Sequence, residues 1–513
     1  MFAGRALLAV FFAGATAFGQ PSIAQNGVTN LASRIPGGRI GRGALFRISG
    51  VRLAESGKTD VRLNKEGRVI PVQVVKASDR SIDAWMPENV PTGAASLTVT
   101  VNGKQSRAFA LEVEGSEPGL FSQNGDGWGP AVAVNLSKGR SANFSSRPAR
   151  GGDVVALMAT GVTGAVTAVV GNRAVTGEVR ATNEVGKQEV TLTIPSDSLE
   201  GCWVPVYLQT GSGRASNVVT LVIESKPAPC VSGLLPEGAG RIGVVALSRT
   251  QVKRLAKRPR PGDEGATVDD ARASFVEVKK DAPLTPLRAL PPAGSCAAYD
   301  TSFQANSGLA ASITSVMNPE GRGLDAGSPL RIARGDQERT ISEGAETPGR
   351  YRARLGRTNV PNVKNAQPLF LDPGDYVLKA PGGKDVGSFQ AHFRMPEPLQ
   401  WTNRDQLDSV DRGRGITVKW SGAPDLVLIV ARNVDQVATV IGMVLCTEKG
   451  MAGQFTIPAA LLSHVPASSE VPSESYDELA VAGVSLASPI QTRGLNAGWV
   501  MSISLFEQFV RYR

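Results

Sequence analysis

Short alternating strands separated by turn residues dominate the N-terminal part of the chain and constrain its fold most. Residues 69–75 (VIPVQVV), 96–101 (SLTVTV) and 108–113 (AFALEV) alternate in polarity, and Asn102 and Gly103 follow the second run. Successive strand side chains point to opposite faces, so this period of two predicts strands with one face in a core. Asn-Gly between such runs indicates a hairpin, because the tight turn needs positive φ at both positions. The sequence therefore predicts antiparallel β-structure.

The same order of segments occurs twice along the chain. The first set spans residues 43–113, and residues 152–161 open a second set. That set continues through a strand that ends at Pro195 and through strands at residues 204–208 and 218–223. Two units of roughly 90 residues, each with several short strands, are typical of β-sandwiches. We therefore predict an all-β chain that begins with two tandem immunoglobulin-like sandwiches.

Several segments of these units resemble known domains. Residues 46–50 (FRISG) and 96–113 resemble the immunoglobulin-like IPT/TIG module. The junction resembles an uncharacterised family of secreted proteins abundant in Solibacter-type acidobacteria, in which a PGLF segment, a Gly-rich turn and a PAxxG segment precede a second sandwich. The matching segments are residues 117–121 (EPGLF), 124–131 (NGDGWGPA), 148–152 (PARGG), 201–206 (GCWVPV) and 216–218 (SNV).

This resemblance covers about residues 28–225. It implies an IPT/TIG-like sandwich at residues 28–115 and a second immunoglobulin-like sandwich at residues 116–228. The first unit departs from the pattern at Ala108 and Phe109, where it lacks the SNV strand of the second, so the two copies are not equivalent. The family has no established activity to transfer to this chain.

The N-terminus has the three parts of a secretory signal peptide. One cation, Arg5, precedes the apolar residues 6–18, and small residues follow. The alternative is a buried N-terminal helix, although the apolar run is too short to span a bilayer and leads into polar sequence. We therefore predict a signal peptide at residues 1–24 and export to the periplasm, the cell surface or the medium, with no transmembrane segment after cleavage. Two cleavage sites fit, with Ala17 and Gly19, or Ser22 and Ala24, at the −3 and −1 positions.

Composition agrees with this fold class and gives a first indication of partners. The chain contains 57 Gly and 33 Pro without a collagen period, which fits many short strands joined by turns. The net charge of +9 favours acidic envelope polymers or anionic surfaces. Nucleic acid would fit that charge equally well, but 55 basic against 46 acidic residues is a modest excess over this length. We predict no nucleic-acid partner and propose envelope polysaccharide or protein as partner classes.

Four cysteines, Cys202, Cys230, Cys296 and Cys446, suit an oxidising compartment. No pair has CxxC or Cys/His metal spacing, so we expect disulfides, no metal site and no cofactor. Three connectivities are possible. We favour Cys202–Cys230, because both residues flank one predicted hairpin, and this choice leaves Cys296–Cys446 as a long-range pair.

Residues 229–513 continue the β pattern with less regular spacing. Strand-like runs include residues 242–247 and 425–430. The pattern is compatible with one domain or with two subdomains. In the second case the subdomains would span residues 229–398 and 399–513. Trp401 and Trp420 are interpreted as core or rim aromatics in preference to sugar platforms.

The sequence contains no recognisable catalytic centre. His392 and His464 are the only histidines, and neither lies in a nucleophile motif. The loop from Asn124 lacks the ligand spacing of a calcium-binding loop, and the tripeptide at residues 334–336 (RGD) is short enough to arise by chance. Carboxylate-pair catalysis stays open, because two acids can come from anywhere in a fold.

We therefore expect no catalytic residue and a non-catalytic, exported multi-domain protein that binds or adheres at the cell envelope. The alternative is a carbohydrate-active enzyme, or its accessory module, with a carboxylate-based site in residues 229–513. A concave site there with two facing carboxylates about 5–10 Å apart would favour the enzyme.

Overall fold

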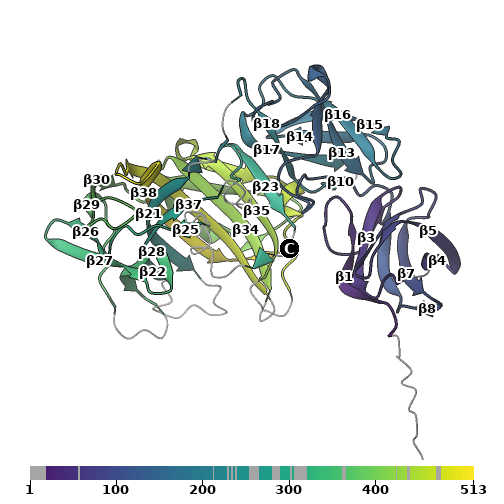
Figure 1. Cartoon of the computed structure of the whole chain (residues 1–513), viewed down its shortest axis with the longest axis horizontal. Coiled ribbons are helices and arrows are strands. Elements are labelled where there is room, and N and C mark those ends of the chain that lie inside the picture. The colour runs from purple at the N-terminus through teal and green to yellow at the C-terminus, as the bar shows by residue number, and fades with distance from the viewer. Residues whose placement is uncertain are drawn as a thin grey trace, which may run out of the picture.

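The structure is a computed structural model in which nearly every element is a β-strand. The first sandwich lies at the right of Figure 1, the second above it, and a larger C-terminal sheet at the left. The predicted all-β fold with two tandem sandwiches is confirmed. The predicted signal peptide falls mostly on residues 1–18, outside the described residues. The structure describes residues 19–55, 58–211, 213–227, 230–232, 235–236, 240–253, 265–279, 289–300, 303–304, 321–360, 366–422, 424–435, 439–469 and 475–513.

The first sandwich contains nine strands in two layers, ordered β1-β3-β6-β5-β4-β7-β9-β2, with β8 paired to β7. Strand β5 belongs to both layers, because its first half pairs with β4 and its second half, beyond an irregularity after Val74, pairs with β6. The strands are β1 (Ser22–Asn30), β2 (Arg39–Gly41), β3 (Leu45–Val51), β4 (Thr59–Lys65), β5 (Arg68–Ala77), β6 (Ser81–Trp85), β7 (Gly93–Val101), β8 (Lys104–Gln105) and β9 (Phe109–Glu114).

The period of two in the sequence corresponds to the two faces of these strands. Leu97, Val99 and Val101 of β7 point into the core of the first sandwich, while the residues between them are half-buried. The turn after β7 is formed by Asn102 and Gly103, with φ of 50° and 79°. The predicted Asn-Gly turn is therefore present, and the chain after it forms both the short β8 and the longer β9.

The second sandwich repeats the strand order of the first. The path β3-β6-β5-β4-β7-β9 corresponds to β13-β16-β15-β14-β17-β18, and β15 again joins both layers. The strands are β10 (Gly119–Leu120), β11 (Ala133–Asn135), β12 (Ser141–Ala142), β13 (Val154–Thr160), β14 (Val166–Val170), β15 (Arg173–Ala181), β16 (Gln188–Thr193), β17 (Gly201–Thr210) and β18 (Val219–Ile223), with a 3-10 turn η1 (Leu136–Lys138).

The repeat extends to single hydrogen bonds. Ser106 and Ser216 each receive a backbone N–H on their hydroxyl, from Val99 and Leu208 respectively, and each hydroxyl donates to the next residue's carbonyl. Asn217 follows Ser216 and its side chain binds both the N–H and the carbonyl of Leu120. The first sandwich has no asparagine after Ser106. The copies thus differ at Arg107, one residue before Ala108 and Phe109, where the difference was predicted. The strand predicted to be missing from the first copy is present as β9, in the place that β18 takes in the second.

The C-terminal region is built on a 14-stranded sheet. Its order is β23-β35-β34-β37-β38-β21-β22-β28-β27-β26-β29-β30, with β24 paired to β35 and β25 to β22. Strands β21 (Arg241–Lys253) and β38 (Ala497–Phe509) lie side by side in parallel. The others are β22 (Ala266–Glu277), β23 (Ser295–Tyr299), β24 (Phe303–Gln304), β25 (Arg322–Gly323), β26 (Leu330–Arg334), β27 (Gln337–Gly344), β28 (Thr347–Thr358), β29 (Gly374–Ala380), β30 (Phe389–Met395), β34 (Leu426–Asp435), β35 (Thr439–Lys449) and β37 (Ser475–Pro489).

This sheet takes strands from both sides of the possible boundary at residue 398. Its two faces support two apolar cores, one mainly from residues after 398 and one mainly from residues before it. Smaller elements complete the region, namely β19 (Val231–Ser232), β20 (Leu235–Pro236), β31 (Gln400–Trp401), β32 (Ser409–Val410), β33 (Ile416–Ser421), β36 (Gln454–Ile457), β39 (Arg511–Tyr512), α2 (Ala459–Leu462), η2 (Arg404–Gln406) and η3 (Gly450–Ala452).

The three units are joined by direct contacts. Between the sandwiches, the Leu45 N–H donates to Thr160 Oγ1 at 2.8 Å and Arg214 forms ion pairs with Glu114 and Glu117. Val169 and Tyr207 of the second sandwich belong to the same core cluster as the C-terminal sheet. The second sandwich is therefore packed onto the C-terminal region through apolar side chains.

Two disulfides hold the later part of the chain. Cys202 bonds to Cys230, 28 residues later, and Cys296 bonds to Cys446, its direct partner across β23 and β35. This is the connectivity that the sequence analysis favoured.

Candidate functional site

Trp401 and Trp420 are core residues, as predicted. Their side chains are 5% and 4% exposed, and each indole N–H is satisfied, Trp401 by Asn403 Oδ1 and Trp420 by the Gly450 carbonyl. Neither ring is available as a platform for sugar.

The two histidines lie in different environments. His392 is exposed on β30, where its ring contacts the Gln390 side chain. His464 is buried, and its Nδ1 lies 2.9 Å from both carboxylate oxygens of Asp300. Burial lowers the pKa of His464, but the charge and hydrogen bond of Asp300 outweigh it and raise that pKa above its usual value. The pair holds two segments together in a place without solvent access.

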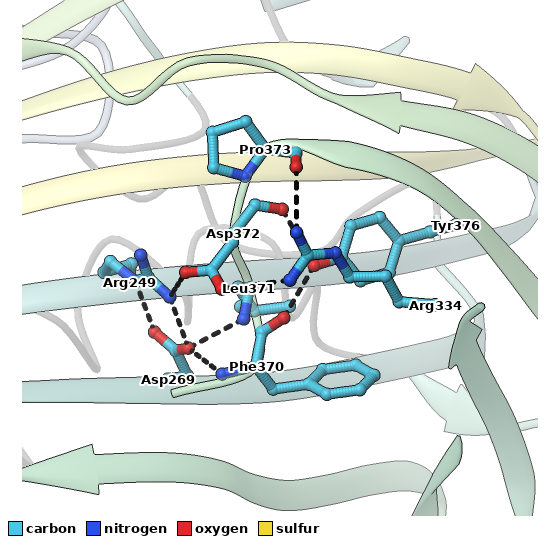
Figure 2. Close-up of polar contacts among 8 residues, drawn as sticks. All are labelled: Arg249, Asp269, Arg334, Phe370, Leu371, Asp372, Pro373 and Tyr376. Atoms are coloured by element: carbon cyan, nitrogen blue, oxygen red, sulfur yellow. Dashed lines mark hydrogen bonds and ion pairs between the residues drawn. The ribbon is translucent and has the colours of Figure 1, made fainter. Parts of the chain in front are cut away.

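A polar cluster centred on Asp269 joins several strands and loops of the C-terminal region (Figure 2). Asp269 is fully buried and accepts hydrogen bonds from Arg249 Nε at 2.8 Å and from the backbone N–H groups of Phe370 and Leu371. Arg249 also pairs with Asp372 at 3.0 Å. The carboxylate of Asp269 is thus enclosed by donors, which suits an anchor for residues 370–372 and leaves no oxygen free for a substrate.

The RGD tripeptide lies at the turn between β26 and β27, beside this cluster. Arg334 is engaged there, because it pairs with Asp372 at 2.9 Å and donates to the Pro373 carbonyl, as Figure 2 shows.

The Gly-rich loop from Asn124 is likewise occupied by its own contacts. Gly125, Gly127 and Gly129 have φ of 74°, 82° and 84°, and the Asn217 side chain binds the Gly127 carbonyl. Among the residues that the structure describes, no three His, Cys, Asp or Glu side chains gather where they could hold a metal ion.

An open hollow on β22 and β28 is the strongest candidate for a binding site. It has a volume of about 490 Å³ and lies under the hairpin turn between β27 and β28. Among the described residues, its charged lining consists of Arg272, Arg350, Arg352 and Glu346, and Ser274 and Thr347 add hydroxyl groups. Arg272, Arg352 and Glu346 are exposed, so a ligand can reach them.

Strand register explains why the arginines meet. In the antiparallel pair β22–β28, Arg272 lies directly opposite Arg352, and Ser274 lies opposite Arg350. Arg350 and Arg352 are two residues apart on one strand, so their side chains leave the same face. The Arg350 guanidinium donates to Ser274 Oγ at 3.0 Å.

These residues lie in none of the motifs recognised in the sequence. The run RYRAR at residues 350–354 places an arginine at every second position, which is a visible signal for a cationic strand face. The opposing Arg272 is about 80 residues away in the chain, and only the register of the folded sheet brings it there.

The other hollows among the described residues are lined by fewer charged side chains. One at β29 and β30 includes Asp375 and His392 with a volume of about 610 Å³, and one near the start of β1 includes Arg52 and Arg107. Each hollow reported among the described residues has at most one carboxylate in its described lining. The pair of facing carboxylates that would favour a glycosidase is not found in these linings.

No protein-family model matches the chain, and no curated protein matches its sequence. Among solved structures, a surface glycan-binding protein from Prevotella bryantii is 13% identical, with a TM-score of 0.16, over 38% of this chain and 40% of that one. A mixed-linkage glucan utilization protein from Bacteroides ovatus is 15% identical, with a TM-score of 0.21, over 61% and 67%. The extending region of a large adhesion protein is 11% identical, with a TM-score of 0.14, over 95% and 98%. Similarity this low carries no argument about function.

Within the described residues, no helix has the length and apolar character needed to cross a membrane.

Proposed function

We propose that this chain is an exported, non-catalytic protein that binds at the cell envelope, with the hollow on β22 and β28 as its binding site. The observation that carries the proposal is the chemistry of the hollow's lining. Guanidinium and hydroxyl groups can hold a polar ligand by donating hydrogen bonds. An arginine stays protonated at any physiological pH, so it is poorly suited to general acid–base catalysis.

The architecture supports the same proposal. The hollow lies on long paired strands, and rigid sheets hold a binding surface in a fixed shape. The second sandwich is packed onto this sheet through Val169 and Tyr207, so the sandwiches and the hollow form a continuous body. The signal peptide pattern and two disulfides support an exported location.

A glycan array and a pull-down from envelope extracts test this proposal with the mature chain. Saturable binding of a polysaccharide or an envelope protein is the expected result. If neither assay finds a specific ligand, the binding proposal fails and a structural spacer becomes the better description.

The alternative, a carbohydrate-active enzyme, requires a proton donor and a second carboxylate at one site. Glu346 is the single carboxylate in the described lining of the hollow. Incubation of the mature chain with polysaccharides should therefore release no new reducing ends. Release that is lost on Glu346→Gln would support the enzyme instead.

A further inference from the structure

The β22–β28 pair places two like charges side by side, and no described residue supplies a counter-charge to them. Arg272 and Arg352 are direct cross-strand partners, and like charges in this position destabilise an antiparallel pair. Neither guanidinium has an ion-pair partner among the described residues. At the next position on this face, Arg354 pairs with Asp270 at 2.6 Å. Among the described residues, the same strands thus carry one arginine with an acidic partner beside two arginines without one.

We infer that this hollow binds an acidic polysaccharide through the carboxylates of its sugars. The inference rests on the proposed function and names the ligand class of that site. A guanidinium presents two parallel N–H groups that match the two oxygens of a carboxylate. A bound carboxylate between Arg272 and Arg352 would convert their repulsion into two charge-assisted contacts. Arg350, held by Ser274, adds a third cation along the strand.

The lining favours charge over ring stacking as the means of recognition. Tyr351, the one aromatic residue in the described lining, is 2% exposed, and its hydroxyl accepts a hydrogen bond from the backbone N–H of Ala326. Neutral sugars and nucleobases are usually held against exposed aromatic rings. A hollow with cations, hydroxyls and no available described ring is therefore better suited to an acidic sugar than to a neutral one or to nucleic acid.

Glu346 places a negative charge at one edge of the hollow, whereas the arginines lie on its strands. It lies on the hairpin turn at the edge of the hollow and forms no ion pair with a described cation. Its carboxylate repels an anionic ligand, so the acidic groups of the sugar chain lie on the strand side, toward Arg272 and Arg352. Removing this charge should tighten binding, which is the opposite of the effect of removing an arginine.

The test is a titration of the mature chain with polygalacturonate oligomers and with the same oligomers fully methyl-esterified. The wild type should bind the acid form and not the ester. Arg272→Gln/Arg352→Gln should weaken binding by about tenfold for each arginine, because each removes a charge-assisted contact. Glu346→Gln should bind a few-fold more tightly. The double variant should melt no lower than the wild type, because it relieves a repulsion.

Arg68→Gln/Arg147→Gln is the matched control. Both residues are exposed on the sandwiches, and their loss changes the net charge by the same amount. Binding should stay within about twofold of the wild type if the site is specific. Equal weakening of both double variants would overturn the inference in favour of a general charge effect. Binding of the ester as tightly as the acid would also overturn it, while leaving the proposed binding function intact.

Single-stranded DNA is the remaining arm of the test. Nucleic acid would be the better ligand assignment if the chain binds DNA more tightly than polygalacturonate and if Arg272→Gln/Arg352→Gln abolishes that DNA binding. If the mature chain binds neither oligomer and does not bind DNA, the inference fails. The proposed function fails only if the glycan array and the pull-down are negative as well.

Discussion

Asp269 is a buried carboxylate that joins separate segments of the C-terminal region, so we expect its loss to be costly. Its carboxylate has no exposure and joins Arg249 to the backbone of Phe370 and Leu371. Asp269→Asn leaves the Arg249 guanidinium without its closest counter-charge. Loss of one partner from a buried pair costs about 3–5 kcal/mol. Because Arg249 keeps its pair with Asp372, we expect a fall in stability near the lower end of that range, measured by urea denaturation.

Asp375→Asn provides the comparison for this prediction. Asp375 pairs with Arg394 at 3.7 Å, but both side chains are mostly exposed. An exposed pair contributes little, so the change should stay within about 0.5 kcal/mol. Similar losses in both variants would show that Asp269 is not an anchor.

Some contacts of single residues could be predicted from the sequence and others could not. The cysteine pairs were favoured correctly because one pair flanks a hairpin and few combinations exist. The meeting of Arg272 with Arg352 depends on pairing between strands distant in sequence, and nothing local encodes that register. The network around Asp269 was missed for the same reason.

At the scale of elements, the turn between β7 and β8 depends on glycine. Gly103 has φ of 79° and open space around its missing Cβ, so backbone strain is the main cost of a side chain there. Gly103→Ala should destabilise the first sandwich by about 1 kcal/mol. Gly115→Ala is the matched control, because that glycine also has open space and no positive φ. Equal effects in thermal unfolding would refute the turn assignment.

Strand β1 distinguishes the two possible cleavage sites of the signal peptide. It begins at Ser22, and Ser22 and Ile23 pair with Val51 and Gly50 of β3. Cleavage after Ala24 would remove these pairs, whereas cleavage after Gly19 leaves the strand complete. We therefore expect the mature chain to begin at Gln20, which revises the end of the signal peptide from residue 24, as predicted from the sequence, to residue 19. Mass spectrometry of the exported protein tests this, and a chain that begins at Gln25 would contradict it.

Local pattern predicted the elements of the sandwiches well because each strand has one buried face and an explicit turn. Residues 218–223 were predicted as a strand and include β18. The C-terminal sheet was harder to derive, because several of its strands are buried on both faces and lose the alternation. Strand β21 illustrates this with seven consecutive buried residues from Ile242 to Ser248. Its parallel pairing with β38, near the end of the chain, has no local signal.

At the scale of the whole molecule, His464 lies where the C-terminal region meets the second sandwich. Asp300 and Glu117 are the charged groups that raise its pKa, and a backbone contact with Ser216 acts in the same direction. A raised folded pKa means that protonated His464 stabilises the fold below about pH 6.5, its usual pKa. That contribution is lost as the pH rises through the folded pKa.

The stability advantage of the wild type over His464→Gln should therefore be largest near pH 6 and decrease toward pH 9. Thermal midpoints across this range measure it, and subtraction of the two proteins cancels other titrating groups. A difference that does not change with pH would mean that His464 contributes only through packing.

We propose that the chain binds an envelope polysaccharide and does not cut it. Titration of the mature chain with polygalacturonate oligomers, followed by determination of the length of the recovered oligomers, tests both parts of this proposal. We expect saturable binding that weakens in Arg272→Gln/Arg352→Gln, with the oligomers recovered at full length. Binding unaffected by those substitutions, or oligomers recovered in shortened form, would contradict it.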